Sequence, residues 1–90
     1  MSLNNIIFVD HYPKLDLHGE TTETARVLIQ DFIHDNIKLK QKIIVIVHGV
    51  GSGAIRQATW DTLRKNKNVL DYKTFYYNNG CTVVELKIDF

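Results

Sequence analysis

The 90-residue sequence contains one cysteine, one proline and no long apolar run. Because Cys81 has no possible partner within the chain, an internal disulfide is excluded, and we expect a reducing, cytoplasmic environment. No apolar stretch approaches the roughly eighteen residues of a membrane span or resembles a signal segment, so we expect a protein that is neither membrane-bound nor exported. Strong charge of one sign is also lacking. The formal net charge is +1, so any contact with nucleic acid must depend on a local patch.

A hydrophobic content of 44% is sufficient for one compact domain with a modest core. Hydrophobic periodicity, capping residues and turn residues divide the chain into an N-terminal arm and six elements. The arm, residues 1–13, contains an apolar stretch at 6–9 that we interpret as an arm or edge strand. The predicted elements are a strand at 14–18, a helix capped by Thr21 or Thr22 and running to about 33, a strand at 43–47, a helix capped by Ser52 and running to about 65, and strands at 72–77 and 81–88.

This order, β-α-β-α-β-β, predicts an α/β fold, specifically a two-layer α/β sandwich. Two strands that flank one helix favour a right-handed crossover with parallel strands. The last two strands are expected to form a hairpin with its turn at Asn78-Asn79-Gly80. Five consecutive aliphatic residues at 43–47 are typical of a strand buried on both faces, which we place centrally. We therefore predict a mixed four-stranded sheet with both helices on one face.

Two of the predicted strands end in the same dipeptide, His18-Gly19 and His48-Gly49. If these strands are parallel neighbours, about 4.8 Å apart, both imidazoles reach the crevice where α/β sheets bind ligands. Asp16 lies two residues before His18 and could orient that ring and raise its proton affinity. One histidine could then accept a proton while the other donates one, as phosphoester cleavage requires.

The strand at 43–47 is followed by glycine at every second position, at Gly49, Gly51 and Gly53, and then by a helix. Glycine lets backbone approach a ligand closely, and the N–H groups at a helix start suit a phosphate and the charge that develops on it. Arg56 falls in the first turn of this helix. A cation there is unfavourable by roughly 0.3–1 kcal/mol unless an anion binds beside it.

Each of these residues also has a simpler interpretation. A histidine at a strand end is more often structural than catalytic, Asp16 can cap backbone amides, and Arg56 can bend into solvent. Any strand-to-helix turn can use glycine. The convergence of these groups at one sheet edge nevertheless favours a phosphate-handling site. His11 and His34 lack such neighbours, and we predict that both are surface residues.

Three blocks of sequence, LDLHG at 15–19, VHGVGSGAIR at 47–56 and GCTVVEL at 80–86, together resemble the small MutS-related (Smr) domain. The resemblance covers about residues 14–88 and implies an N-terminal arm at 1–13 followed by an Smr domain at 14–90. It implies a fold like that of the C-terminal domain of translation initiation factor three. Many members are nicking endonucleases that act on DNA or RNA, whereas others bind nucleic acid without evident cutting.

The resemblance assigns roles to named positions. The acid and histidine of the first block fall on Asp16 and His18, and the second-block histidine falls on His48, so these are the implied catalytic residues. The implied phosphate- or nucleic-acid-binding residues are Gly49, Gly51, Ser52, Gly53 and Arg56. The chain departs from the family at Tyr77-Asn78-Asn79-Gly80, where members often have a longer glycine-rich loop, and this bears on substrate choice.

The implied function is an endonuclease that cleaves or nicks phosphodiester bonds in DNA or RNA. With RNA, the 2′-OH can be the nucleophile and no metal is required; with DNA, water must attack, and a magnesium ion on Asp16 becomes an option. The alternative is a non-catalytic nucleic-acid-binding module in DNA repair or recombination, or on ribosomes. A third option is a protein-interaction domain with a decayed site, against which the intact histidines argue. The expected partner is nucleic acid, delivered by a ribosome or a host repair complex, and the sequence fixes neither the metal nor the oligomeric state.

Overall fold

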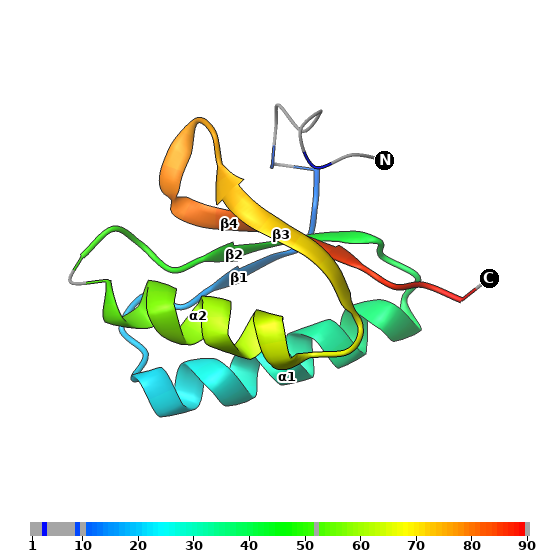
Figure 1. Ribbon diagram of the computed structural model, residues 1–90, viewed down its shortest axis with the longest axis horizontal. Coiled ribbons are helices and arrows are strands. Elements are labelled where there is room, and N and C mark those ends of the chain that lie inside the picture. The colour runs from blue at the N-terminus through cyan, green and yellow to red at the C-terminus, as the bar shows by residue number, and fades with distance from the viewer. Residues whose placement is uncertain (1–2, 4–8, 10, 52, 90) are drawn as a thin grey trace.

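The computed structural model describes residues 3, 9, 11–51 and 53–89, which form two layers. Figure 1 shows both helices on one face of a single sheet. The elements are β1 (Lys14–Asp16), α1 (Thr22–Lys38), β2 (Ile43–Val47), α2 (Ala54–Lys65), β3 (Val69–Phe75) and β4 (Asn78–Leu86). The predicted α/β sandwich and its element order are confirmed. In the described part of the chain, neither helix combines the length and apolarity that crossing a membrane would demand.

The sheet has the strand order β1-β2-β4-β3. β1 and β2 are parallel, whereas β4 runs antiparallel to both β2 and β3, so the predicted mixed sheet is confirmed. β2 lies between β1 and β4, and Ile44, Val45 and Ile46 in it are fully buried. The uninterrupted aliphatic run therefore identified a strand that is covered on both faces.

Each face of the sheet has its own core. The helix-side core packs Leu17, Ile44 and Val84 against the apolar stripes of the helices, which include Ile29 and Leu63. On the opposite face, three described residues of the predicted N-terminal arm, Leu3, Val9 and Tyr12, pack against the sheet. The residues of this outer core are Leu3, Ile43, Val45, Phe75, Cys81 and Val83, with Val9, Tyr12 and Val47 at its edge. The strand predicted at 6–9 lies outside the described residues apart from Val9.

Helix α1 begins as predicted but ends later. Thr21 is the N-cap and forms a reciprocal capping box with Thr24, which satisfies N–H groups that have no partner within the helix. The prediction that this helix runs only to about 33 is wrong, because it continues to Lys38. Asn36 is buried, and its side-chain amide donates to the Phe32 carbonyl at 2.8 Å, so the polar group is satisfied inside the helix. Ile37 also packs against the core, which extends α1 to Lys38.

The predicted hairpin is present, but its bounds were wrong. β3 starts at Val69 rather than 72, β4 ends at Leu86 rather than 88, and the turn lies at 76–77, not at Asn78-Asn79-Gly80. Asn78 already pairs with Phe75 across the hairpin. The turn prediction relied on asparagine adopting positive φ, but in the described ranges the non-glycine residue with positive φ is Lys40.

Candidate functional site

The candidate site lies at the sheet edge where β1 and β2 end. Because these strands are parallel neighbours, with Asp16 opposite Val47, the segments carrying His18 and His48 leave the sheet side by side. The Leu17 N–H donates to the Val47 carbonyl at 2.9 Å, which extends the pairing one residue beyond β1. The two histidines, thirty positions apart in sequence, thus emerge from one edge of the fold.

His18 and Asp16 form the exposed part of this edge. The Asp16 carboxylate accepts a hydrogen bond from the backbone N–H of His18 at 2.9 Å. It therefore holds the turn at the strand end, which is the capping role that the sequence left open. Gly19 follows with φ +82°, a conformation that suits glycine, so the chain turns sharply and leaves the His18 side chain exposed.

His48 lies in a different environment, because its residue is 7% exposed and both ring nitrogens are hydrogen-bonded. Nδ1 lies 2.8 Å from the Gly49 carbonyl oxygen, and Nε2 lies 2.8 Å from Thr82 Oγ1. Since a carbonyl can only accept, Nδ1 carries the proton. The Trp60 indole N–H donates to the same Thr82 hydroxyl at 3.0 Å, which leaves the hydroxyl proton for Nε2. The result is a continuous chain of donors from Trp60 through Thr82 and His48 to Gly49.

This hydrogen-bond chain keeps His48 neutral. Burial lowers the pKa of the His48 imidazole below its ordinary value, and the nearby positive charge of Arg56 lowers it further, against the opposite effect of the Gly49 hydrogen bond. Proton transfer by His48 to a substrate would require the Thr82 bond to break. In this geometry the ring therefore fixes the first residue of the glycine loop.

The glycine loop is anchored a second time by β4. The backbone N–H groups of His48 and Gly49 donate to the Gly80 carbonyl at 2.9 and 3.0 Å. A Cβ on Gly80 would lie 3.3 Å from Gly49 Cα, so the two backbones need glycine to approach this closely. Gly49 and Gly53 have φ of +78° and +88°, while Gly51 is exposed. Ser52, predicted as the cap of α2 and as a phosphate contact, lies outside the described residues.

The start of α2 differs from the start of α1. α1 has a complete capping box and Glu23 in its first turn. α2 has Gly53 as its N-cap, and among the residues that the structure describes there is neither a side-chain cap nor an acidic residue in its first turn. The positive end of the α2 dipole therefore faces the glycine loop without a counter-charge from the helix itself.

Arg56, in the first turn of α2, is half-buried rather than bent into solvent. Its Nη2 donates to Thr74 Oγ1 at 2.9 Å, and its guanidinium carbon lies 5.2 Å from the centre of the Trp60 ring. A cation–π contact of this kind contributes roughly 0.5–1 kcal/mol at an exposed site. That is about the size of the unfavourable dipole term, so Arg56 is held beside the loop with or without an anion.

The sequence reasoning missed Thr82, Trp60 and Thr74. Thr82 is fully buried and carries a hydroxyl within the apolar run of β4, which is a sign that a buried polar group has a specific partner. Trp60 lies four residues after Arg56, the spacing at which side chains meet on a helix surface. Thr74 is on β3 and left no signal, because its contact depends on the packing of α2 beside the hairpin.

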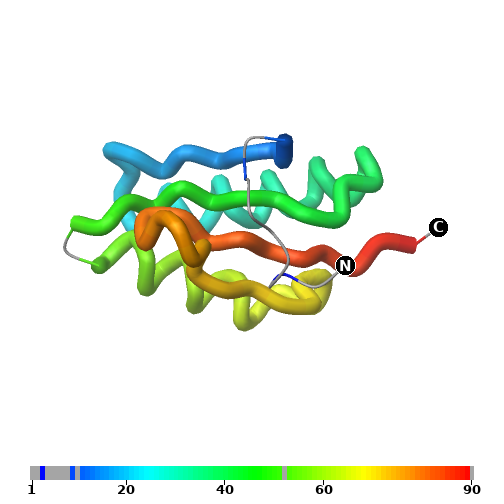
Figure 2. The backbone as a smooth tube through the Cα atoms, turned by 90° about the horizontal axis from the view of Figure 1, so that it is seen from above, coloured from blue at the N-terminus to red at the C-terminus, as the bar shows by residue number. Residues whose placement is uncertain are grey.

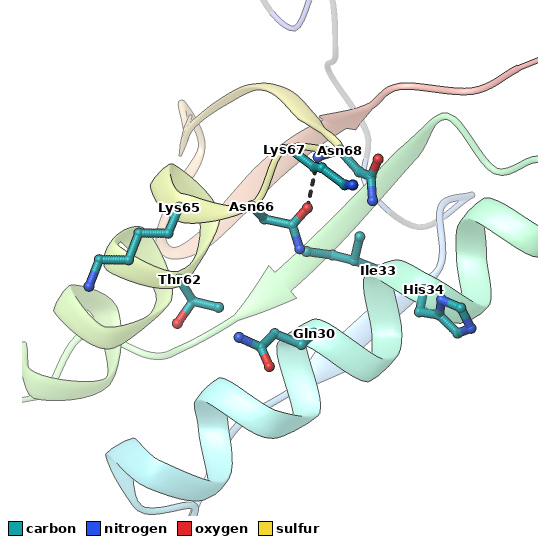
Figure 3. Close-up of a pocket in the computed structure, with 8 residues that line it drawn as sticks. All are labelled: Gln30, Ile33, His34, Thr62, Lys65, Asn66, Lys67 and Asn68. Carbon is teal, nitrogen blue, oxygen red and sulfur yellow. Dashed lines mark hydrogen bonds between the residues drawn. The ribbon is translucent and has the colours of Figure 1, made fainter.

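A hollow of 370 Å³ lies away from this site, at the carboxyl end of α2 (Figure 3). Its walls come from the second half of α1, the last turn of α2 and the α2–β3 connection: Gln30, Ile33, His34, Thr62, Lys65, Asn66, Lys67 and Asn68. None of the predicted site residues that the structure describes lines it. His11 and His34 are exposed, as predicted.

A resident metal ion needs several ligand side chains in one place. In the described ranges, no group of three or more histidine, cysteine, aspartate or glutamate side chains is placed to hold one. Asp16 alone does not make a preformed magnesium site, because that ion takes an octahedral shell of about six ligands. The described residues therefore form no preformed site for a resident metal.

Sheet, helices and glycine loop together define a small α/β domain, and the chain belongs to the Smr domain family, whose model matches residues 15–87. It is 39% identical over 80 residues to Endonuclease MutS2 of Bacillus thuringiensis (strain Al Hakam) and to that of Bacillus cereus (strain B4264). Each match covers 82% of this chain and 10% of the relative, so the chain spans about a tenth of the length of these proteins.

Solved structures show the same fold. The Smr domain of Thermus thermophilus MutS2 superposes with a TM-score of 0.80 at 30% identity, over 82% of this chain and 96% of that one. YdaL, a stand-alone small MutS-related protein from Escherichia coli, superposes with a TM-score of 0.79 over 84% of this chain and 67% of that one. At 23% identity, the second likeness concerns the fold alone.

Proposed function

We propose that this chain is an Smr-type endonuclease that cleaves or nicks phosphodiester bonds in DNA or RNA. The relatives named Endonuclease MutS2 share their Smr region with it, which supports a nuclease-related role. The observation that carries the proposal is that the segment with the exposed His18 and the glycine loop that leads into α2 leave the sheet side by side. A phosphate on the N–H groups of the loop and of α2 would place its ester oxygens beside the strand end that carries this imidazole.

In this proposal the residues divide into a binding group and a reacting group. Gly49, Gly51 and Gly53 let the phosphate approach the backbone of the loop closely, although the N–H of Gly49 itself is held by the Gly80 carbonyl, and Arg56 supplies a cation beside them. His18 transfers protons, and Asp16 orients it through the hydrogen bond to its backbone.

His48 takes a positioning role in place of the proton transfer expected from the sequence, because its Nε2 is engaged by Thr82. With RNA, the 2′-oxygen attacks phosphorus, its proton passes to His18, and the departing 5′-oxygen is protonated from His18 or water. With DNA, water replaces the 2′-oxygen as nucleophile.

The test is a cleavage assay with purified protein on labelled single-stranded RNA, duplex DNA and branched DNA, with and without a chelator. We expect His18→Ala to abolish cleavage of at least one substrate while binding persists. His34→Ala is the matched control, because it removes an equally exposed histidine from α1, and it should cleave like the parent. Asp16→Ala should reduce cleavage. Cleavage that survives His18→Ala at the parent rate would refute the assignment.

A second candidate function is a non-catalytic nucleic-acid-binding module that acts in DNA repair or recombination, or on ribosomes. The observation that favours it is that His48 is neutral and fully hydrogen-bonded, and that Asp16 engages backbone. Both residues would then only shape the loop that grips phosphate. Binding by the parent protein without cleavage of any substrate, with or without added magnesium, would support this module over the nuclease.

A further inference from the structure

The tip of the β3–β4 hairpin presents two large aromatic side chains to solvent. Tyr76 is 85% exposed and Tyr77 is 65% exposed. A two-residue turn of tyrosines is unusual, because turns favour glycine, asparagine and proline for their backbone preferences. Neither ring is needed to fill the core, so the turn residues call for an explanation beyond folding.

The two rings are held in place rather than hanging free. The Tyr76 and Tyr77 ring centres are 4.9 Å apart in an edge-to-face arrangement. Tyr77 also makes an edge-to-face contact with Phe75, at 5.6 Å, and Phe75 is buried in the outer core. This series of contacts connects the exposed rings to the core of the sheet, which lowers the conformational entropy that the two tyrosine side chains would lose on binding a ligand.

The hairpin tip lies next to the phosphate-binding loop. Gly80, three residues after Tyr77, accepts the hydrogen bonds from His48 and Gly49 that anchor the loop. Three extended residues span at most roughly 10 Å, so the tyrosines and the loop are within reach of one short stretch of nucleotides. Figure 1 and Figure 2 both place the hairpin tip and the glycine loop toward the same end of the molecule.

We propose that Tyr76 and Tyr77 form a stacking platform for unpaired bases, so that the substrate at this edge is a single-stranded segment of nucleic acid. The inference rests on the proposed function, because it takes the phosphate site at the glycine loop as given. Exposed aromatic rings beside a phosphate-binding groove are how single strands are held without sequence readout, since every base offers a flat face. Bases within a duplex are already stacked on one another and would not fit the platform.

The simplest competing interpretation is that the rings only close the hairpin. Tyr77 does pack on Phe75, but Tyr76 contacts only its neighbour among the ring pairs of the described residues, and its exposure is the highest of the large apolar side chains there. A role in closing the hairpin therefore accounts for part of Tyr77 and leaves Tyr76 unexplained.

The experiment compares the parent with Tyr76→Ala/Tyr77→Ala and with the control Tyr76→Phe/Tyr77→Phe, which keeps both rings. Binding of a short fluorescein-labelled oligonucleotide is measured at fixed salt, as a single strand and as a duplex, in DNA and RNA forms. We expect the alanine variant to lose roughly 5- to 150-fold in single-strand affinity, with little change for duplex. The phenylalanine variant should bind like the parent. Thermal unfolding of each variant separates loss of the platform from loss of the fold.

Three results would overturn the platform: an alanine variant that binds single strands as tightly as the parent, an equal loss for duplex, or a parent that prefers duplex. The first of these would leave the rings as a surface for a protein partner. The platform and the nuclease fail separately. Single-strand binding that depends on the tyrosines, by a protein that cleaves no substrate, would support the platform and reject the nuclease. Cleavage by the parent, together with unchanged single-strand binding by the alanine variant, would support the nuclease and reject the platform.

Discussion

Replacing Thr82 by valine tests the hydrogen-bond chain that fixes His48. The substitution keeps the shape of a fully buried side chain and removes only its hydroxyl. His48 Nε2 then loses its donor in a site that is 7% exposed, which costs about 1–3 kcal/mol for an unsatisfied buried group. The Trp60 N–H also loses its acceptor, but Trp60 is only half-buried and water can replace it. We therefore expect a loss of about 2 kcal/mol, or about 8–16 °C in the unfolding midpoint of a domain of this size.

The assay is thermal and urea unfolding followed by circular dichroism, with Thr59→Val as the matched control. Thr59 is also fully buried, but its hydroxyl donates to the Ile55 carbonyl four residues earlier. In a helix that carbonyl already accepts a backbone N–H, so it keeps a partner when the hydroxyl is removed. Its replacement should cost well under half as much. If the Thr82 and Thr59 variants are equally stable, the chain of hydrogen bonds through Thr82 does not hold His48. An NMR measurement that places the ring proton of the parent's His48 on Nε2 would also refute the reasoning.

The remaining predictions concern pH, the loop and Arg56. The folded-state pKa of His48 lies below its ordinary value of 6.5, so the unfolded chain binds that proton more readily. The stability that neutral His48 contributes is fully present above pH 6.5 and is lost as the pH falls below that value. In a plot of the free energy of unfolding against pH, His48→Asn should remove this decrease, whereas His34→Asn should leave it in place. Gly53→Ala should lower the free energy of unfolding, measured with denaturant, by about 1–2 kcal/mol, because Gly53 has a φ of +88°. Gly51→Ala should be nearly neutral, because a Cβ at Gly51 would enter open space and its φ is not in the left-handed region. Arg56→Ala should weaken binding about equally for all nucleic-acid sequences and reduce the salt dependence of binding. Arg56→Lys should restore the binding affinity only in part, because the guanidinium stacked on Trp60 is lost. A loss of affinity that depends on the nucleic-acid sequence would contradict the phosphate role.

The order of elements could be predicted from sequence because it depends on strong local patterns. The aliphatic run Ile43–Val47 and the capping threonine before α1 are readable without tertiary information. The errors occurred where tertiary contacts override local preference. Asparagine is common in turns, but a hydrogen bond from the buried Asn36 side chain to the Phe32 carbonyl keeps Asn36 within the helix. Asn78 and Gly80 also favour a turn, yet β4 pairing and the close approach of Gly80 to Gly49 place them in a strand.

The candidate site was predictable as a set of positions but not as a set of roles. Parallel pairing of two strands that end in His-Gly was enough to place His18 and His48 at one edge. Their different environments were not readable, because they depend on β4 and α2, which supply Thr82 and Trp60 to one histidine only. Identical dipeptides in the sequence thus have different chemistry, since burial and hydrogen bonding decide which ring is available to a ligand.

The contrast between the two helix starts is the strongest physical indication of where a ligand binds. An N-terminal side-chain cap is typically worth about 1 kcal/mol, and α1 has one in Thr21. α2 begins instead at Gly53, in a left-handed conformation, with Arg56 rather than an acid in its first turn. In a domain whose total stability is on the order of 5–15 kcal/mol, a helix start with no acidic residue in its first turn leaves its dipole for a bound anion to stabilise. Since the glycine loop is held from behind by His48 and Gly80, an anion at this end of α2 would meet a loop whose backbone is already fixed, which is what the proposed phosphate site requires.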